Sequence, residues 1–351
     1  MLAGAVGLVV LLLTLRDPAR EPDSGSSPLA VAPTWAGPKP VDVSGMLPDG
    51  ATYVPRLFLT AETSVGVATS PDGTVRVMLA RPPGTFIELR RLNASDSPQI
   101  NGFAVGGDAL VWMESVARPG GVLTTTLWRT AWRTGARPTE VTRNTGDASF
   151  YGLESDVVIA DTTVTWTAIA PGPSNETEVR SVALTGGQVS IKRLPGEYGL
   201  SSSPWVVTVP TGSGGVVTLV NLTTSATTTV TTGATEVAAC SPTWCRVAVT
   251  SDAALVGIEL MRPDGSGRRK IAGGEATPTI ADPTLLDRWV PLATDRGDGG
   301  VGLSIYDLES GKTDLVTPNA ANVQGRNGVL WWSTGAGTTL TWHAVDLRQI
   351  P

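Results

Sequence analysis

Tryptophan residues recur along this chain at a nearly constant spacing, which restricts the folds that the sequence can form. Six of them open or sit in short apolar runs, at successive separations of 54, 39, 39, 45 and 42 residues: Trp112, Trp166, Trp205, Trp244, Trp289 and Trp331. A period of about 40 residues is typical of proteins built from repeated units that cannot fold alone and stack on one another. We therefore expect one repeat array rather than several unrelated domains.

Residues 289–318 form the clearest copy of the repeated unit. An apolar run, an alternating run and a short closing run follow one another here, separated by glycine- and aspartate-rich turns, at residues 290–294, 302–308 and 313–317. Short runs of this kind are typical of antiparallel strands. A small sheet cannot bury both of its faces alone, so we expect the copies to stack around an axis, where neighbouring blades cover the inner strands on both sides.

The number of units is seven if the segment before the first tryptophan is counted. Residues 64–93 have the same succession of strands and turns, whereas the last unit, residues 322–347, ends without a fourth strand. Residues 52–59 resemble a strand without a unit, and we expect them to complete the last blade and close the ring, which removes exposed sheet edges. The sequence thus predicts an all-β fold, a β-propeller of four-stranded blades closed by an N-terminal strand, with seven blades favoured and six as the alternative. Two packed β-sandwiches would not explain a constant tryptophan period.

The N-terminal region has a different composition from the rest. Residues 2–15 are uncharged and mostly apolar and are followed by Arg16, so residues 1–16 are predicted to be a hydrophobic helix that serves as a transmembrane anchor or a signal segment. An uncleaved anchor is favoured, and a cleaved signal peptide and a buried core segment are the alternatives. Residues 17–50 have the proline- and serine-rich composition of a disordered linker, and residues 51–351 are assigned to the propeller.

The charge distribution argues against nucleic acid as a partner. The formal net charge is -6, and arginine and aspartate are scattered evenly along the chain. The densest basic run, Arg268, Arg269 and Lys270, is only three residues long and falls in a turn. Proteins that bind nucleic acid instead gather basic residues on one face.

Three turn sequences resemble those of a known propeller family. Ser70-Pro71-Asp72-Gly73 precedes a strand, MRPDGSGRRK occupies residues 261–270, and YDLESGK occupies residues 306–312. These turns resemble the TolB-like, WD40-like repeat of the PD40 type, found in bacterial propellers outside the cytoplasm. The resemblance implies a scaffold that binds other proteins. That family is known for six blades, from which the count of seven departs.

The two cysteines are close in sequence and flank a turn. Cys240 and Cys245 lie between the first and second strands of the fifth unit, so a hairpin disulfide is favoured in an exported domain, and two reduced buried thiols are the alternative. A metal site at the cysteines is disfavoured because His343, the single histidine, is remote in sequence. In the turn DRGDGG, Asp295 and Asp298 suit calcium in part, but an ordinary blade turn is favoured. No cofactor is expected.

The residue inventory disfavours catalysis. Any triad would have to use His343, which lies within an expected strand, and no GxSxG element or separate hydrolase domain is found, so we expect no enzyme. The alternative is an extracellular propeller that binds or cleaves carbohydrate through carboxylates in its central funnel. Candidates near inner turns are Asp108, Asp156, Asp252, Asp282 and Asp287, although no spacing links any pair of them.

A pair of tryptophans in the second unit has two interpretations. Trp128 and Trp132 fall on the same side of an expected strand, and they either pack against the neighbouring blade, which is favoured, or form a ligand surface with Arg129 and Arg133.

The expected function is that of a binding scaffold in the cell envelope. We expect a single-pass membrane protein whose propeller lies outside the cytoplasm, or a secreted protein if the N-terminal segment is cleaved. The expected partners are unidentified envelope proteins, with a small ligand or a glycan as the alternative.

Overall fold

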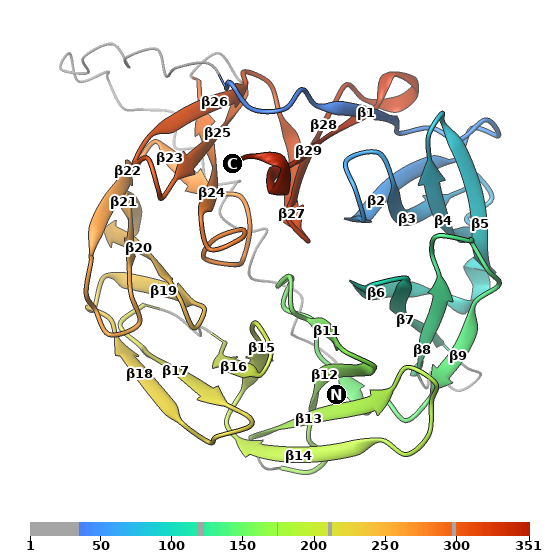
Figure 1. Cartoon of the computed structure of the whole chain (residues 1–351), viewed down its shortest axis with the longest axis horizontal. Coiled ribbons are helices and arrows are strands. Elements are labelled where there is room, and N and C mark those ends of the chain that lie inside the picture. The colour runs from blue at the N-terminus through green and yellow to red at the C-terminus, as the bar shows by residue number, and fades with distance from the viewer. Residues whose placement is uncertain (1–34, 118–122, 174, 210–212, 297–299) are drawn as a thin grey trace. The chain divides into compact units, whose positions relative to one another are not determined.

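The computed structural model describes residues 35–117, 123–173, 175–209, 213–296 and 300–351. Within them, seven antiparallel sheets are arranged as the blades of a propeller around a central channel (Figure 1). The prediction of seven blades is therefore confirmed. The helix expected at residues 1–16 lies outside the described residues, and no helix among those described is long and apolar enough to cross a membrane.

Blades 1 to 3 follow one another along the chain. Blade 1 consists of β2 (Thr52–Phe58), β3 (Ser64–Thr69), β4 (Val75–Arg81) and β5 (Thr85–Leu92), followed by the 3-10 helix η1 (Ala94–Asp96). Blade 2 consists of β6 (Gln99–Gly106), β7 (Ala109–Ala117), β8 (Leu123–Ala131) and β9 (Thr139–Thr142). Blade 3 consists of β10 (Asp147–Ala148), β11 (Val157–Ala160), β12 (Thr163–Ile169), β13 (Glu176–Ala183) and β14 (Ser190–Pro195).

Blades 4 to 6 continue in the same order. Blade 4 consists of β15 (Tyr198–Leu200), β16 (Trp205–Thr208), β17 (Val216–Asn221) and β18 (Thr227–Thr231). Blade 5 consists of β19 (Glu236–Cys240), β20 (Cys245–Ser251), β21 (Ala254–Met261) and β22 (Arg269–Gly273). Blade 6 consists of β23 (Ala276–Pro278), β24 (Trp289–Asp295), β25 (Val301–Asp307) and β26 (Thr313–Thr317).

Blade 7 joins the two ends of the described chain. It consists of β27 (Ala321–Arg326), β28 (Val329–Thr334) and β29 (Thr341–Asp346), with the 3-10 helices η2 (Gly337–Thr339) and η3 (Leu347–Gln349), and its outer strand is β1 (Val41–Ser44). β1 pairs with β29 from Val41 opposite Ala344 to Ser44 opposite Thr341. An N-terminal strand thus closes the ring, as predicted.

The identity of the closing strand was predicted wrongly. Residues 52–59 do not complete blade 7, because residues 52–58 form β2, the first strand of blade 1, and pair with β3. β2 buries Tyr53, Leu57 and Phe58, as suits a strand covered by neighbouring blades, whereas β1 alternates between half-buried and exposed residues, as suits an outer strand. β1 lies within residues 17–50, for which a disordered linker was expected.

The recurring tryptophans lie in, or directly before, the second strands of their blades. Trp112, Trp166 and Trp331 belong to second strands and are almost completely buried, and Trp244 immediately precedes a second strand. Hydrophobic clusters form between adjacent blades. One of them joins Trp112 of blade 2 to residues of blade 1 and also takes in Trp128 and Trp132, so the packing interpretation of this pair is correct.

The alternating strand directions give the ring two distinct faces. Face A carries the turns between first and second strands and between third and fourth strands. Face B carries the turns between second and third strands and the connections from blade to blade. The closing strand β1 starts at face A, and Trp35 upstream of it packs in the cluster between blades 6 and 7.

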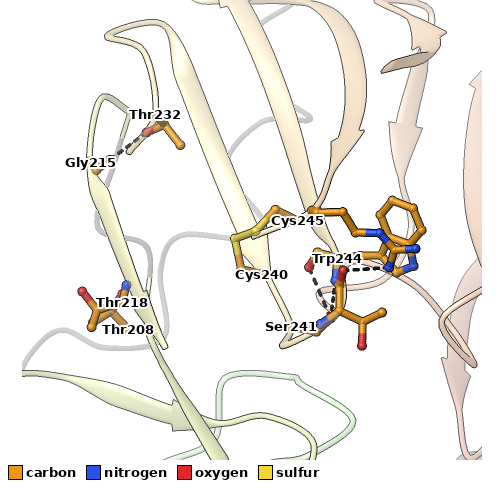
Figure 2. The surroundings of a disulfide bond; sticks show 10 residues. Thr208, Gly215, Thr218, Thr232, Cys240, Ser241, Trp244 and Cys245 are labelled. Atoms are coloured by element: carbon orange, nitrogen blue, oxygen red, sulfur yellow. Dashed lines mark hydrogen bonds between the residues drawn. A yellow bond between two sulfur atoms is a disulfide. The ribbon is translucent and has the colours of Figure 1, made fainter. Parts of the chain in front are cut away.

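A disulfide bond joins Cys240 and Cys245 across a turn on face A (Figure 2). The two residues are opposite each other at the end of the β19–β20 ladder. In the turn, the Ser241 hydroxyl oxygen accepts hydrogen bonds from the backbone N–H groups of Thr243 and Trp244, at 3.2 and 3.0 Å. The Trp244 indole N–H donates to the Asp287 carbonyl at 3.0 Å, which connects this turn to blade 6.

Removal of the disulfide is expected to have a moderate effect. Replacing both Cys240 and Cys245 by alanine should lower the free energy of unfolding by about 2 kcal/mol, because the bond closes only a short loop in the unfolded chain. Urea denaturation of the oxidised protein, the reduced protein and the double variant measures this. The reduced wild type and the variant should unfold at similar urea concentrations, and equal midpoints for oxidised and reduced wild type would contradict the prediction.

Candidate functional site

The first strand of blade 3 is interrupted by an eight-residue segment that enters the central channel. β10 pairs with the end of β12, and β11 pairs with its beginning, and we call residues 149–156 between them the channel segment. The Ser149 N–H still donates to the Thr167 carbonyl of β12, and the residues after Ser149 leave the sheet. In Figure 1, β11 and the green loop before it approach the centre of the ring. Backbone groups that leave a sheet need other hydrogen-bond partners.

Asp156 supplies two of these partners from within the channel segment. Its buried carboxylate accepts hydrogen bonds from the backbone N–H groups of Tyr151, at 2.9 Å, and Gly152, at 2.8 Å. Burial raises the pKa of Asp156 to about 6, although the two backbone hydrogen bonds act in the opposite direction. Asp156 therefore fixes the shape of the channel segment.

Two further carboxylates connect the channel segment to blades 6 and 7. The backbone N–H of Glu154 donates to Asp282 Oδ2 at 2.7 Å, and the Glu154 carboxylate accepts from the backbone N–H of Asn327. Desolvation by burial is the main cause that raises the pKa of both Glu154 and Asp282. The channel segment thus runs from blade 3 to the β23–β24 connection and the β27–β28 turn, and it divides the channel.

Arg246 fixes the β23–β24 connection that carries Asp282. Its guanidinium is buried and donates to the carbonyl oxygens of Ile280, at 2.8 Å, and Ala281, at 3.2 Å, and also to those of Asp282 and Pro283. Desolvation lowers the pKa of Arg246 to about 10, so this side chain remains charged at neutral pH. The channel segment depends on Arg246 through Asp282.

A pocket lies on each side of the channel segment. The face-B pocket has a volume of about 500 Å³ and is lined by residues of β2, β6 and β27 and by Phe150, Gly152 and Asp156 of the channel segment. The face-A pocket has a volume of about 350 Å³ and is lined by Glu154, Asp282 and several turns of face A. Both volumes are in the range of small-molecule sites.

The structure gathers some of the predicted carboxylates and leaves others apart. Asp156, Asp282 and Asp287 line the pockets, whereas Asp108 and Asp252 line neither of them. Asp108 instead accepts a hydrogen bond from the backbone N–H of Arg133 at 2.9 Å.

Glu154 was missed by sequence reasoning. A usable signal was present, because the separation from Trp112 to Trp166 is the longest of the series and the channel segment accounts for part of the extra length.

The channel carboxylates hold backbone groups in place. Glu154, Asp156 and Asp282 each accept at least one backbone N–H. Among the described residues, no group of three or more His, Cys, Asp or Glu side chains could hold a metal ion. Asp298, one of the two aspartates of the calcium alternative, lies outside the described residues.

The buried carboxylate of Asp156 predicts a specific pH dependence. Between about pH 4 and pH 6, folded Asp156 keeps a proton that the unfolded chain releases, so this group makes the protein less stable as pH rises, by about 3 kcal/mol in total. An Asp156→Asn variant should lack this loss. Urea denaturation from pH 4 to 7 tests the difference between the two proteins, and parallel profiles would contradict the prediction.

Face B exposes large apolar side chains in five consecutive blades. Of the exposed large hydrophobic residues that the described ranges contain, these five lie at the beginnings of third strands or at the end of a second strand: Leu123, Ile169, Val216, Val256 and Val301. The remaining two, Ile191 and Leu286, are on face A. These five residues come from five different sheets and share one face of the ring.

Comparisons with known proteins identify similar folds. No family model matches the chain, and no curated protein matches it. Among solved structures, a prolyl endopeptidase is similar over 87% of this chain and 49% of its own, at 12% identity and a TM-score of 0.55. A puromycin-hydrolysing peptidase of Mycobacterium tuberculosis is similar over 91% of this chain and 55% of its own, at 15% identity and a TM-score of 0.54.

TolB of Acinetobacter baumannii is also among the similar structures, over 81% of this chain and 79% of its own, at 11% identity and a TM-score of 0.37. The chain spans about half the length of the two peptidases. At such identities a structural match shows the fold alone. The chain is therefore a seven-bladed β-propeller, and the comparisons assign it to no family.

Proposed function

We propose that this protein is a non-catalytic binding propeller that recognises another protein through face B. The observation that carries the proposal is the set of exposed apolar side chains in blades 2 to 6, all on one face. Loops and strand ends on one side of a rigid ring are the usual place for such recognition. Apolar contacts at the centre of an interface with a polar rim supply much of the binding energy.

The channel carboxylates support binding over catalysis. Asp156 and Asp282, which a carbohydrate-active propeller would use, hold the backbone of the channel segment instead. Glycosidases need two carboxyl groups free to act on the two sides of a sugar bond. The proposal therefore includes no reaction.

We also propose that the propeller works in the cell envelope, outside the cytoplasm. The Cys240–Cys245 disulfide is typical of an oxidising compartment, and the apolar residues 2–15 suit an anchor or an export signal.

The test is capture of the partner with the full chain from membranes of its own host. Ile169 and Val216 are 54% and 56% exposed, so a double change to aspartate should leave the fold intact and lower the recovery of a specific partner at least tenfold. The matched control is Ile191→Asp on face A, 44% exposed, which should retain the partner. Equal recovery with both variants would refute face B as the binding surface. Specific binding of a polysaccharide with no protein partner would refute the scaffold role.

A further inference from the structure

The face-B pocket contains two arginine side chains without hydrogen-bond or ion-pair partners among the described residues. Arg56 is on β2 of blade 1 and Arg326 ends β27 of blade 7, and both line the pocket. Several other arginines of the ring are paired; for example, Arg348 donates to Asp346 at 2.8 Å, and Arg90 donates to Glu114 at 2.9 Å. Arg56 and Arg326 therefore keep their donors available.

The two cations act on each other. Arg56 is exposed, but the surrounding protein removes part of its hydration, and this desolvation lowers the pKa of Arg56. The positive charge of Arg326 is the second cause of the lower pKa. Asp156 is the third charged residue that lines the pocket, and its carboxylate accepts hydrogen bonds from two backbone N–H groups. The lining of this pocket thus has two cations and one carboxylate. Arg326 also lines the face-A pocket, and its charge partly offsets the desolvation that raises the pKa of both Glu154 and Asp282. An anion placed between Arg56 and Arg326 would offset their mutual repulsion.

The other walls of the pocket combine aromatic side chains with polar groups. Phe103, Phe150, Trp331 and Trp342 line it, together with three side-chain amides. The indole N–H of Trp342 donates to the Tyr53 carbonyl, whereas the buried indole nitrogen of Trp331 has no acceptor among the described residues. A pocket of about 500 Å³ lined by four aromatic rings and several polar groups is suited to a small molecule that has both an apolar body and a polar group.

We propose that the face-B pocket binds a small organic anion, with its carboxylate or phosphate group held between Arg56 and Arg326 and its apolar body against Phe103 and Phe150. Guanidinium groups hold both kinds of anion through paired, charge-assisted hydrogen bonds. The ligand relieves the repulsion between the two arginines, which come from the first and the last blade. This site is independent of the apolar set proposed for partner binding.

The experiment uses the full-length protein and four probes of defined chemistry: phenyl phosphate, benzoate, inorganic phosphate and neutral benzyl alcohol. Calorimetry should show that phenyl phosphate or benzoate binds at least tenfold more tightly than benzyl alcohol, and the comparison of the two acids identifies the preferred group. Inorganic phosphate, which lacks the apolar body, should bind more weakly than phenyl phosphate.

Variants connect the binding to the two arginines. Arg56→Gln and Arg326→Gln should each weaken binding of the preferred acid at least tenfold, and Arg56→Lys should have an intermediate effect because it keeps the charge but not the planar group. Arg137→Gln is the matched control, because Arg137 is exposed and outside the pocket, and it should bind as the wild type does. Thermal unfolding without ligand checks that each variant folds. Equal affinity in all folded variants, or no binding of either acid at millimolar concentration, would overturn the proposal. Neither outcome affects capture of a protein partner through Ile169 and Val216.

Discussion

Replacing Arg246 by methionine is expected to lower the free energy of unfolding by about 3 to 5 kcal/mol. The change keeps much of the apolar volume but removes the donors for the carbonyl oxygens of residues 280–283. Buried acceptors without donors are costly, and Asp282 also loses a nearby positive charge that helps it stay ionised. The β23–β24 connection should therefore loosen, and with it the contact between Asp282 and Glu154.

Urea denaturation measures the loss, and limited proteolysis locates it. The first new cleavages in the Arg246→Met variant should fall within residues 149–156 or 279–288, since these segments depend on each other. Arg137→Met is the control, because Arg137 is exposed, and its stability should stay within about 0.5 kcal/mol of the wild type. Wild-type stability of the Arg246 variant would mean that solvent replaces the guanidinium at no cost, contrary to the burial described above.

Replacing Glu178 by glutamine should also cost about 3 to 5 kcal/mol. Glu178 is 1% exposed and accepts hydrogen bonds from Arg180 Nε at 2.8 Å and from Arg193 Nη2 at 3.0 Å. Arg180 is itself buried, and its other partner is Asn144 in the connection from blade 2. Glutamine has nearly the same shape but no charge, so the variant retains a buried guanidinium without its anion.

A matched control separates burial from charge. Glu140 pairs with Arg143 at 2.8 Å on the surface, so Glu140→Gln removes the same charge from an exposed pair and should change the stability by no more than about 0.5 kcal/mol. The two variants should also differ in salt dependence, because only the exposed pair is strongly screened. Similar urea midpoints for both variants would show that Glu178 contributes no more than a surface charge.

The fold could be predicted because the repeat leaves a local signal in each blade. The second strand of a blade is covered on both sides, so a large buried side chain recurs at an equivalent position in successive blades, as Trp112, Trp166 and Trp331 show. The closing strand left no such signal. β1 is four residues of alternating pattern after a proline-rich stretch, and its partner β29 is at the other end of the chain.

The site was predictable only in part, for a similar reason. The disulfide depends on two cysteines five residues apart, and the spacing alone suggests it. The contact between Glu154 and Asp282 joins residues 128 positions apart, and only closure of the ring brings them together. Asp156 and Asp282 were therefore candidates without a link. Likewise, nothing local indicates that Arg56 and Arg326 line the same pocket.

The closure of the ring by β1 also determines how it resists force. Because β1 and β29 are antiparallel, the beginning of β1 is next to the end of β29, and a pull between the two chain ends would open their pairs singly, starting at Val41 and Ala344. The Asp42–His343 contact at 2.7 Å is the second in line. Load from upstream reaches Trp35 first, whose backbone N–H donates to the Leu315 carbonyl and whose indole packs edge-on against Trp289. A pull from upstream must therefore break the contacts of Trp35 before it can separate β1 from β29.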